Sequence, residues 1–294
     1  MHEILIISGK GGTGKTSLTA AFAHLSRNTV LCDLDVDAPD LHLVLNPKSS
    51  TKNTFISGLE AKIEPDQCHK CGVCKEMCRF NAVNERNDIF TIDPLRCEGC
   101  GVCVHFCPYD AIAFTPKECG YWSISKTRFG KMIHAQLHPG EDNSGKLVAL
   151  LRREAKQLAE SQGAEFLLSD GPPGIGCPVI SALSGIDLVI IVTEPTPSGR
   201  HDLYRVVKLC EYFKISSTVI INKCDLNPNI VKEIQSYCKE KGMLLLAKVP
   251  HTNDFVHAMV NGLTITEYSN SDVTRQLQIS WERICQLIEG GIAA

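Results

Sequence analysis

The sequence lacks the features that direct a protein to a membrane or to nucleic acid. No segment approaches the ~18 uninterrupted apolar residues that a membrane-spanning helix needs. The first residues, MHEILIISGK, have no basic region before their short apolar run, so they do not resemble a secretory signal. A formal net charge of −3 provides no broad positive field for DNA or anionic lipid. We therefore expect a cytoplasmic protein.

The composition is that of an ordinary globular protein, apart from its cysteines. Hydrophobic residues make up 44% and charged residues 21% of the 294 positions, and this length favours one large domain plus a small insert. Fifteen cysteines are present. Without a secretory signal they indicate a reducing compartment, in which they bind metal or remain thiols.

Apolar strands alternate with helices along most of the chain. The expected strands are Ile4–Ser8, Thr29–Asp33, Glu165–Ser169, Ile186–Thr193, Ser217–Ile221 and Met243–Val249. The expected helices are Lys15–Leu25, Lys146–Ser161, 198–214 and 227–241. This order predicts an α/β fold with a doubly wound, mostly parallel sheet, whose ligands bind at the carboxyl ends of the strands. Residues 60–117 interrupt the alternation and are expected to form a small inserted α+β domain, which leaves 1–59 and 118–294 for the main domain. Residues 118–145 have no clear assignment.

The last expected helix, 272–289, carries one apolar face. The face could lie on a membrane surface, but such helices usually have many basic flanking residues, and here there are few. We therefore expect the face to pack into the core. It consists of Val273, Leu277, Trp281, Ile284 and Ile288.

Eight of the cysteines fall in two runs with the same spacing. The runs are Cys68-x2-Cys71-x2-Cys74-x3-Cys78 and Cys97-x2-Cys100-x2-Cys103-x3-Cys107-Pro108. They form an internal duplication, because CHKCGVCKEMCRFNAV repeats as CEGCGVCVHFCPYDAI. This spacing surrounds a [4Fe-4S] cluster with four thiolates, the fourth cysteine of each run serving the other cluster.

The spacing therefore assigns two [4Fe-4S] clusters. One is expected on Cys68, Cys71, Cys74 and Cys107, and the other on Cys97, Cys100, Cys103 and Cys78. Zinc bound by CxxC pairs is the alternative, and four cysteines per run disfavour it. Residues 60–117 resemble the bacterial two-cluster ferredoxins. The first run departs from the ferredoxin pattern at one position, with Arg79 where the second run has Pro108.

A phosphate-binding loop lies near the N-terminus. The pattern Gly9-x4-Gly14-Lys15-Thr16 follows an expected strand and precedes an expected helix, as such a loop must. Backbone N–H groups of the loop would hold the phosphates, Lys15 would neutralise the β and γ phosphates, and the Thr16 hydroxyl would bind Mg²⁺. The expected nucleotide contacts are Gly9, Lys10, Gly11, Gly12, Thr13, Gly14, Lys15, Thr16 and Ser17.

Three motifs together resemble the MinD/ParA/Mrp superfamily of ATPases. GKGGTGKT resembles its deviant Walker A loop, DLDVDAPDLH its switch I, and FLLSDGPPGIG its Walker B and switch II segments. The resemblance implies a homodimer in which Lys10 reaches the nucleotide of the partner subunit. It also implies that Pro172, Pro173 and Gly174 form a turn that senses the γ-phosphate.

Carboxylates at the ends of two strands complete the expected catalytic site. Asp35 is expected to orient the attacking water, and Asp170 to hold Mg²⁺ through water. Asp33 is expected to support Asp35 without contacting the nucleotide itself. Asn222 and Asp225, in the sequence Asn222-Lys223-x-Asp225, are expected to contact the base. The NKxD pattern alone suggests guanine, whereas the superfamily resemblance favours adenine and therefore ATP.

Two classes of function fit these motifs. In the first, ATP binding and hydrolysis by a dimer gate electron transfer or metallocofactor assembly through the clusters, together with an unidentified redox or assembly partner. In the second, the protein is a positioning switch like MinD or ParA, and its clusters sense redox state. An iron–sulfur carrier or scaffold is a further alternative, weakened because the C-terminal CxxC pair of Mrp-type scaffolds is missing.

Overall fold

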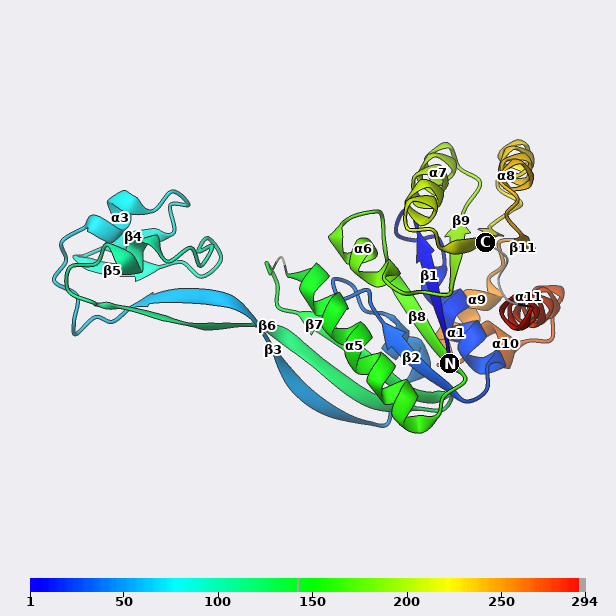
Figure 1. Cartoon of the computed structure of the whole chain (residues 1–294), viewed down its shortest axis with the longest axis horizontal. Coiled ribbons are helices and arrows are strands. Elements are labelled where there is room, and N and C mark those ends of the chain that lie inside the picture. The colour runs from blue at the N-terminus through cyan, green and yellow to red at the C-terminus, as the bar shows by residue number, and fades with distance from the viewer. Residues whose placement is uncertain (142, 291–294) are drawn as a thin grey trace. The chain divides into compact units, whose positions relative to one another are not determined.

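The computed structural model describes residues 1–141 and 143–290 (Figure 1). It divides into two compact units. We call the first the sheet unit, which comprises 1–53, 121–137 and the chain from Ser144 onward, and the second the cysteine unit, which comprises 54–120 and 138–143. The cysteine unit is wider than the expected insert at 60–117, because two long strands, β3 (Ser49–Ile63) and β6 (Ile112–Thr127), continue through the boundary.

One sheet of nine strands organises the sheet unit. Its order is β11-β10-β9-β1-β8-β2-β7-β6-β3, and the neighbours from β11 through β7 pair in parallel. The expected mostly parallel α/β fold is therefore confirmed. The remaining strands are β1 (His2–Ser8), β2 (Thr29–Asp33), β7 (Gly130–Leu137), β8 (Phe166–Pro173), β9 (Leu188–Thr193), β10 (Ser216–Asn222) and β11 (Leu245–Val249).

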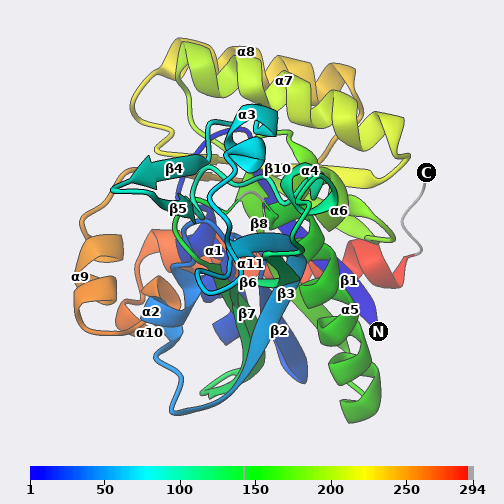
Figure 2. The same ribbon diagram turned by 90° about the vertical axis from the view of Figure 1, so that its left-hand side faces the viewer.

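Helices cover both faces of this sheet (Figures 1 and 2). Strand β1 shows why its sequence is continuously apolar: Ile4 and Ile6 join the core under α1 and α11, while Leu5 and Ile7 are buried on the opposite face. The helices are α1 (Lys15–Leu25), α2 (Leu41–Leu45), α5 (Ser144–Gln162), α6 (Cys177–Leu183), α7 (Pro197–Tyr212), α8 (Pro228–Glu240), α9 (Asp254–Val260), α10 (Ile265–Tyr268) and α11 (Asp272–Glu289).

The apolar face of α11 packs into the core, as expected. All five of its residues are buried, and the Trp281 ring lies 5.7 Å from that of Phe22 and 5.3 Å from that of Phe166. In the part of the chain that the structure describes, no helix is both long and apolar enough to cross a membrane.

The unassigned segment 118–145 is mostly strand. Strands β6 and β7 are neighbours in the sheet and are connected by Arg128 and Phe129. Arg128 donates hydrogen bonds to the backbone carbonyls of Leu45 (2.9 Å) and Val44 (3.3 Å) and forms an ion pair with Glu267 (2.8 Å). The turn between β6 and β7 is therefore tied to the end of α2.

The cysteine unit is small and built from two similar halves. It contains α3 (Val73–Met77), α4 (Val102–His105) and an antiparallel pair formed by β4 (Val83–Arg86) and β5 (Ile89–Ile92). Its core consists of Ala61, Ile63, Val83, Phe90 and Ile112, and six of the repeat cysteines pack against it. Thiol groups thus take the place that aliphatic side chains fill in an ordinary small domain.

The sequence duplication is also a duplication of backbone conformation. Positive φ angles occur at matching positions of the two runs: Lys70 (57°) and Gly99 (60°), Gly72 (81°) and Gly101 (73°), Asn81 (51°) and Asp110 (50°). The helices α3 and α4 start directly after the second pair. Each run therefore makes the same turn around its cysteines.

Candidate functional site

A pocket with about 1320 Å³ of empty space lies at the carboxyl ends of β1, β2 and β8. This is the edge at which parallel α/β sheets bind ligands. The glycine loop, the acidic loop after β2 and the end of β8 meet there, as expected. The lining residues are Ser8, Gly11, Gly12, Thr13, Gly14, Lys15, Thr16, Ser17, Asp35, Asp37, Ala38, Asp40, Leu43, Val44, Pro172, Pro173, Pro178 and Met259.

Gly14 meets two requirements of the loop. Its φ of 88° is in the left-handed region, and a β-carbon there would lie 2.3 Å from the Asn222 side-chain nitrogen. That nitrogen donates a 2.8 Å hydrogen bond to the Thr13 carbonyl. The loop is therefore held against the end of β10.

Asp170 is the centre of a buried polar cluster at the base of the pocket. Its carboxylate is completely buried and accepts from Lys15 Nζ (3.0 Å), Thr16 Oγ1 (2.7 Å) and Thr19 Oγ1 (2.9 Å). Burial by itself lowers the pKa of Lys15, but the carboxylates of Asp170 and Asp35 outweigh burial and raise it. Lys15 therefore stays cationic where phosphates would bind.

Asp33, the last residue of β2, and Asp35, in the acidic loop that follows, lie in different surroundings. Asp33 is buried, and its oxygens accept from the backbone N–H groups of Asp35 (3.1 Å) and Leu41 (3.2 Å). Asp35 lines the pocket, with Oδ2 at 3.5 Å from Lys15 Nζ. Burial raises the pKa of both, most strongly for Asp33, although Lys15 acts in the opposite direction. Asp33 thus shapes the loop that presents Asp35.

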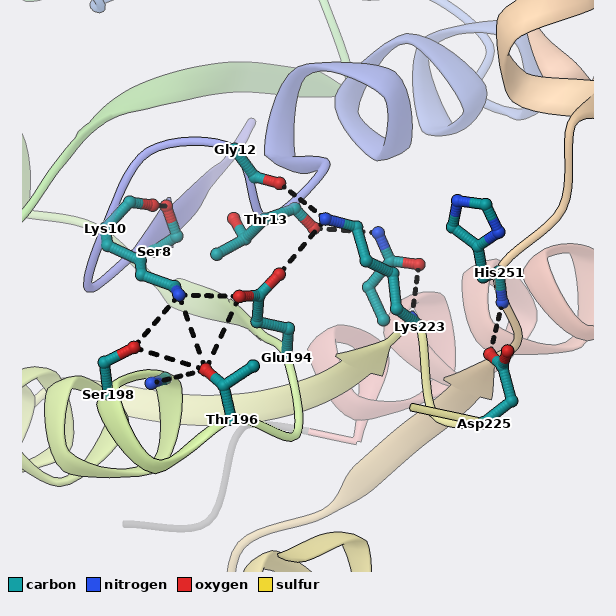
Figure 3. A network of polar contacts seen from close by, with 12 residues as sticks. Ser8, Lys10, Gly12, Thr13, Glu194, Thr196, Ser198, Lys223, Asp225 and His251 are labelled. Carbon is teal, nitrogen blue, oxygen red and sulfur yellow. Dashed lines mark hydrogen bonds and ion pairs between the residues drawn. The ribbon is translucent and has the colours of Figure 1, made fainter. Parts of the chain in front are cut away.

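Lys10 does not line the pocket in this chain. Figure 3 shows its ammonium group against Glu194, at 2.6 Å, and Ser198, at 3.1 Å. Glu194 also binds Lys223 at 3.1 Å, and Lys223 donates to the Gly12 carbonyl at 3.0 Å. Burial alone raises the pKa of Glu194, but the two lysines hold it below its usual value. The reach of Lys10 to a partner's nucleotide stays a prediction.

The two residues expected to contact the base are placed differently. Asn222 lines a second cavity, with about 480 Å³ of empty space, which shares Gly14 and Ser17 with the main pocket. The other lining residues are Lys223, Pro250, His251, Thr252, Phe255 and Val256. Asp225 is not among them. Its carboxylate instead accepts a 2.6 Å hydrogen bond from the His251 backbone N–H, which positions the 250–252 loop.

Several residues of the site were not predicted from the sequence. Glu194 follows β9, and its place after an apolar strand at the carboxyl edge of the sheet was the available signal. For Thr19 the signal was weaker: it lies one helical turn after Lys15. Leu43 and Val44 of α2 had no local signal, because only the folded chain brings that helix to the pocket.

The eight repeat cysteines line two cavities, four in each, and that they ligate [4Fe-4S] clusters stays a prediction. Cys68, Cys71, Cys74 and Cys107 line one cavity of the cysteine unit, with about 340 Å³ of empty space. The other set, Cys78, Cys97, Cys100 and Cys103, lines a second cavity with about 360 Å³. Each cavity therefore receives three thiols from one run and one thiol from the other, and the two cavities are almost equal in size.

Backbone hydrogen bonds point at the sulfur of each crossing cysteine. The Ala82 N–H donates to Cys78 Sγ and the Ala111 N–H to Cys107 Sγ, both at 3.4 Å. Such bonds stabilise thiolates and tune the clusters that they hold. Within residues 1–141 and 143–290, no group of three or more His, Cys, Asp or Glu side chains is gathered closely enough for a single metal ion.

Comparisons with known proteins point to one family. The model of the CobQ/CobB/MinD/ParA nucleotide binding domain matches residues 4–265. An uncharacterized protein of Methanocaldococcus jannaschii is 32% identical over 289 residues, 97% of each chain. The septum site-determining protein MinD of Thermotoga maritima is 24% identical over 295 residues, 96% of this chain and 88% of that protein. The structure of MinD from Pyrococcus horikoshii, complexed with Mg-ADP, matches 100% of this chain and 99% of its own with a TM-score of 0.59 and 16% identity, which shows a shared fold.

Proposed function

Because the chain belongs to the CobQ/CobB/MinD/ParA nucleotide-binding family, we propose that it is an ATP-hydrolysing dimer switch. The switch gates one-electron transfer, or the assembly of a metallocofactor, through two [4Fe-4S] clusters. One observation carries the link between nucleotide and clusters: α2 lines the nucleotide pocket and leads directly into β3, which begins in the sheet unit and continues into the cysteine unit.

The residues at the pocket fit ATP and Mg²⁺. Lys15 is a buried cation facing the space where phosphates bind, and Thr16 and Asp170 provide the hydroxyl and carboxylate that Mg²⁺ prefers. Asp35 faces the same pocket and is the residue that would orient the attacking water. Asn222 and its cavity would receive the adenine. Lys10 would leave Glu194 to reach the partner's nucleotide.

The cysteine unit fits iron–sulfur clusters better than zinc. Each cavity offers four thiols, and the backbone N–H groups of Ala82 and Ala111 support the crossing sulfurs. A bound [4Fe-4S] cluster takes up and releases one electron.

Coupling between the two sites would pass through α2. Leu43 and Val44 meet the nucleotide pocket, while the carbonyls of Val44 and Leu45 hold Arg128 in the β6–β7 turn. Strands β3 and β6 cross from the sheet unit into the cysteine unit, and β3 begins and β6 ends next to this contact. A nucleotide that moves α2 would therefore act on both strands.

The test is an anaerobic redox titration followed by EPR, on protein with no nucleotide, with ADP and with ATP. A midpoint shift of about 60 mV corresponds to tenfold coupling for a one-electron couple and would support the proposal. Iron analysis belongs to the same experiment. Cys107→Ser should remove the cluster of the first cavity and Cys78→Ser that of the second, whereas Cys119→Ser, outside both sets, is the matched control. Protein that contains no iron, or midpoint potentials that are the same with and without nucleotide, would refute the proposal.

A second candidate is a positioning switch that assembles on a surface under ATP. The alignment with MinD of Thermotoga maritima over 96% of the chain favours it. The apolar face of α11, however, is used by the core and does not face outward. Cosedimentation with anionic liposomes that depends on ATP would support this candidate, and its absence would leave the first.

A further inference from the structure

The two halves of the cysteine unit have similar backbone conformations but different formal charges. Between Cys68 and Cys78 the first run carries two cations, Lys70 and Lys75, and one anion, Glu76, a formal charge of +1 with histidine neutral. The matching stretch from Cys97 to Cys107 carries Glu98 as its only charged residue, a formal charge of −1. Because the positive φ angles occur at equivalent positions, the two cavities have similar backbones and differ in formal charge.

The decisive charges lie at the cavities themselves. His69 and Lys70, the two residues between Cys68 and Cys71, line the first cavity. Glu98 lines the second cavity at the position equivalent to His69, and Gly99 replaces Lys70. Lys75, in contrast, is paired with Glu85 at 2.8 Å. Lys70 forms no ion pair with any residue in 1–141 or 143–290, so its charge acts on the cavity without a neutralising partner.

The first cavity also has an accessible edge. Cys71 is exposed, and His69 stacks on Tyr109 with ring centroids 4.2 Å apart, while Tyr109 remains 47% exposed. A cation, an aromatic pair and a cysteine ligand therefore meet on one accessible part of the cysteine unit. We call the residues His69, Lys70, Cys71 and Tyr109 the Cys71 face.

We propose that the two cluster sites differ in reduction potential, the site of Cys68, Cys71, Cys74 and Cys107 being the higher, and that the Cys71 face docks an electron acceptor protein with an acidic surface. This inference rests on the proposed function. Reduction adds one negative charge, which Lys70 stabilises and Glu98 opposes. Charge complementarity selects the acidic partner and speeds its encounter.

The electron balance is simple. A reduced one-electron carrier loses one electron at the Glu98 side, and an oxidised one-electron acceptor protein gains one at the Cys71 face. No covalent bond forms or breaks, and no proton is required.

The first experiment exchanges the charges between equivalent positions. The double variant His69→Glu/Lys70→Gly places the residues of the second run in the first, and glycine tolerates the positive φ at position 70. Glu98→His is the reverse change at the first of the two positions, and Gly99 is kept because a β-carbon there would lie 2.1 Å from the Leu59 carbonyl oxygen. EPR-monitored titration should show two midpoints in the wild type. The double variant should lower the upper midpoint by about 59 mV, which is a tenfold change in the equilibrium constant for reduction. Glu98→His should raise the lower midpoint.

The second experiment probes the Cys71 face with small oxidants of opposite charge. Reduced protein is mixed with anionic tris(oxalato)cobaltate(III) or with cationic hexaamminecobalt(III). The ratio of the anionic rate to the cationic rate should fall severalfold in the double variant at low salt and recover toward wild type at high salt, because salt screens exposed charges.

The outcomes separate this inference from the proposed function. Protein that binds no iron would remove both. If iron content and EPR signals are intact but the charge exchange changes neither the midpoints nor the rate ratios, only the difference in reduction potential and the docking face are overturned. Shifts in the predicted directions in both experiments would establish them.

Discussion

Replacement of Asp170 by asparagine tests the buried cluster on which the nucleotide site rests. The carboxylate neutralises Lys15 and accepts from Thr16 and Thr19 in a completely buried position. Asparagine keeps the shape and one acceptor oxygen but removes the charge. Breaking a buried pair costs about 3–5 kcal/mol, and a hydrogen bond to a charged group contributes about 1.5–3 kcal/mol.

The expected loss of stability is about 3 kcal/mol, at the low end of that range, because Asp35 still lies 3.5 Å from Lys15. At ~2–4 °C per kcal/mol, the melting temperature of the sheet unit should fall by about 6–12 °C. Scanning calorimetry measures this directly. Titration calorimetry on the same variant should show that Mg²⁺ no longer strengthens ATP binding.

The matched control is Thr19→Val, which removes one donor to Asp170 and keeps the branched side chain. Its loss should be about 1.5 kcal/mol, the low end for a hydrogen bond to a charged group, because the Thr19 hydroxyl also donates to the Lys15 carbonyl. An Asp170→Asn protein that melts within about 2 °C of wild type, or no lower than the Thr19→Val protein, would show that the ion pair does not stabilise the site as reasoned.

Three further changes test other parts of the site. Glu194→Gln should lower the free energy of unfolding at neutral pH. Because the folded-state pKa of Glu194 is below its usual value, the variant should be less stable than wild type by the full amount above pH ~4.5, and this difference should vanish as the pH falls through the lower, folded-state pKa. Urea titrations at several pH values measure it. Arg128→Ala should abolish any nucleotide-dependent shift of cluster midpoints while iron content stays at the wild-type level, and Lys75→Ala is a surface control for it. Asn222→Ala should weaken ATP binding about fivefold, roughly the loss of one ~1 kcal/mol hydrogen bond, measured with a fluorescent ATP analogue; equal affinity would show that the base binds elsewhere.

Local patterns in the sequence were enough to locate the main motifs. Within the glycine loop and within each cysteine run the backbone brings the groups together, whereas the crossing of Cys78 and Cys107 depends on how the two runs pack against each other. Alternation of apolar strands and helices likewise predicted the parallel sheet, and the first helix, Lys15–Leu25, was predicted at its observed bounds. Lys15, Thr16 and Asp170 converge because the strands before them are adjacent in the sheet.

Contacts between distant segments were not available from sequence. Asp225 carries the expected motif but faces the His251 loop, since a motif specifies residue types and not the direction of a side chain. The segment 118–145 gave no periodic signal, because β6 and β7 are long strands whose burial varies along their length.

The sequence by itself determined which residues form the phosphate-binding loop and the two cysteine runs, because each of these motifs has a short spacing. Only the tertiary structure decided that Glu194 holds Lys10, that α2 lines the pocket, and that the β6–β7 turn is tied to α2 by Arg128. These contacts join residues that are tens to hundreds of positions apart. Their formation depends on the packing of the whole sheet, which no local pattern records.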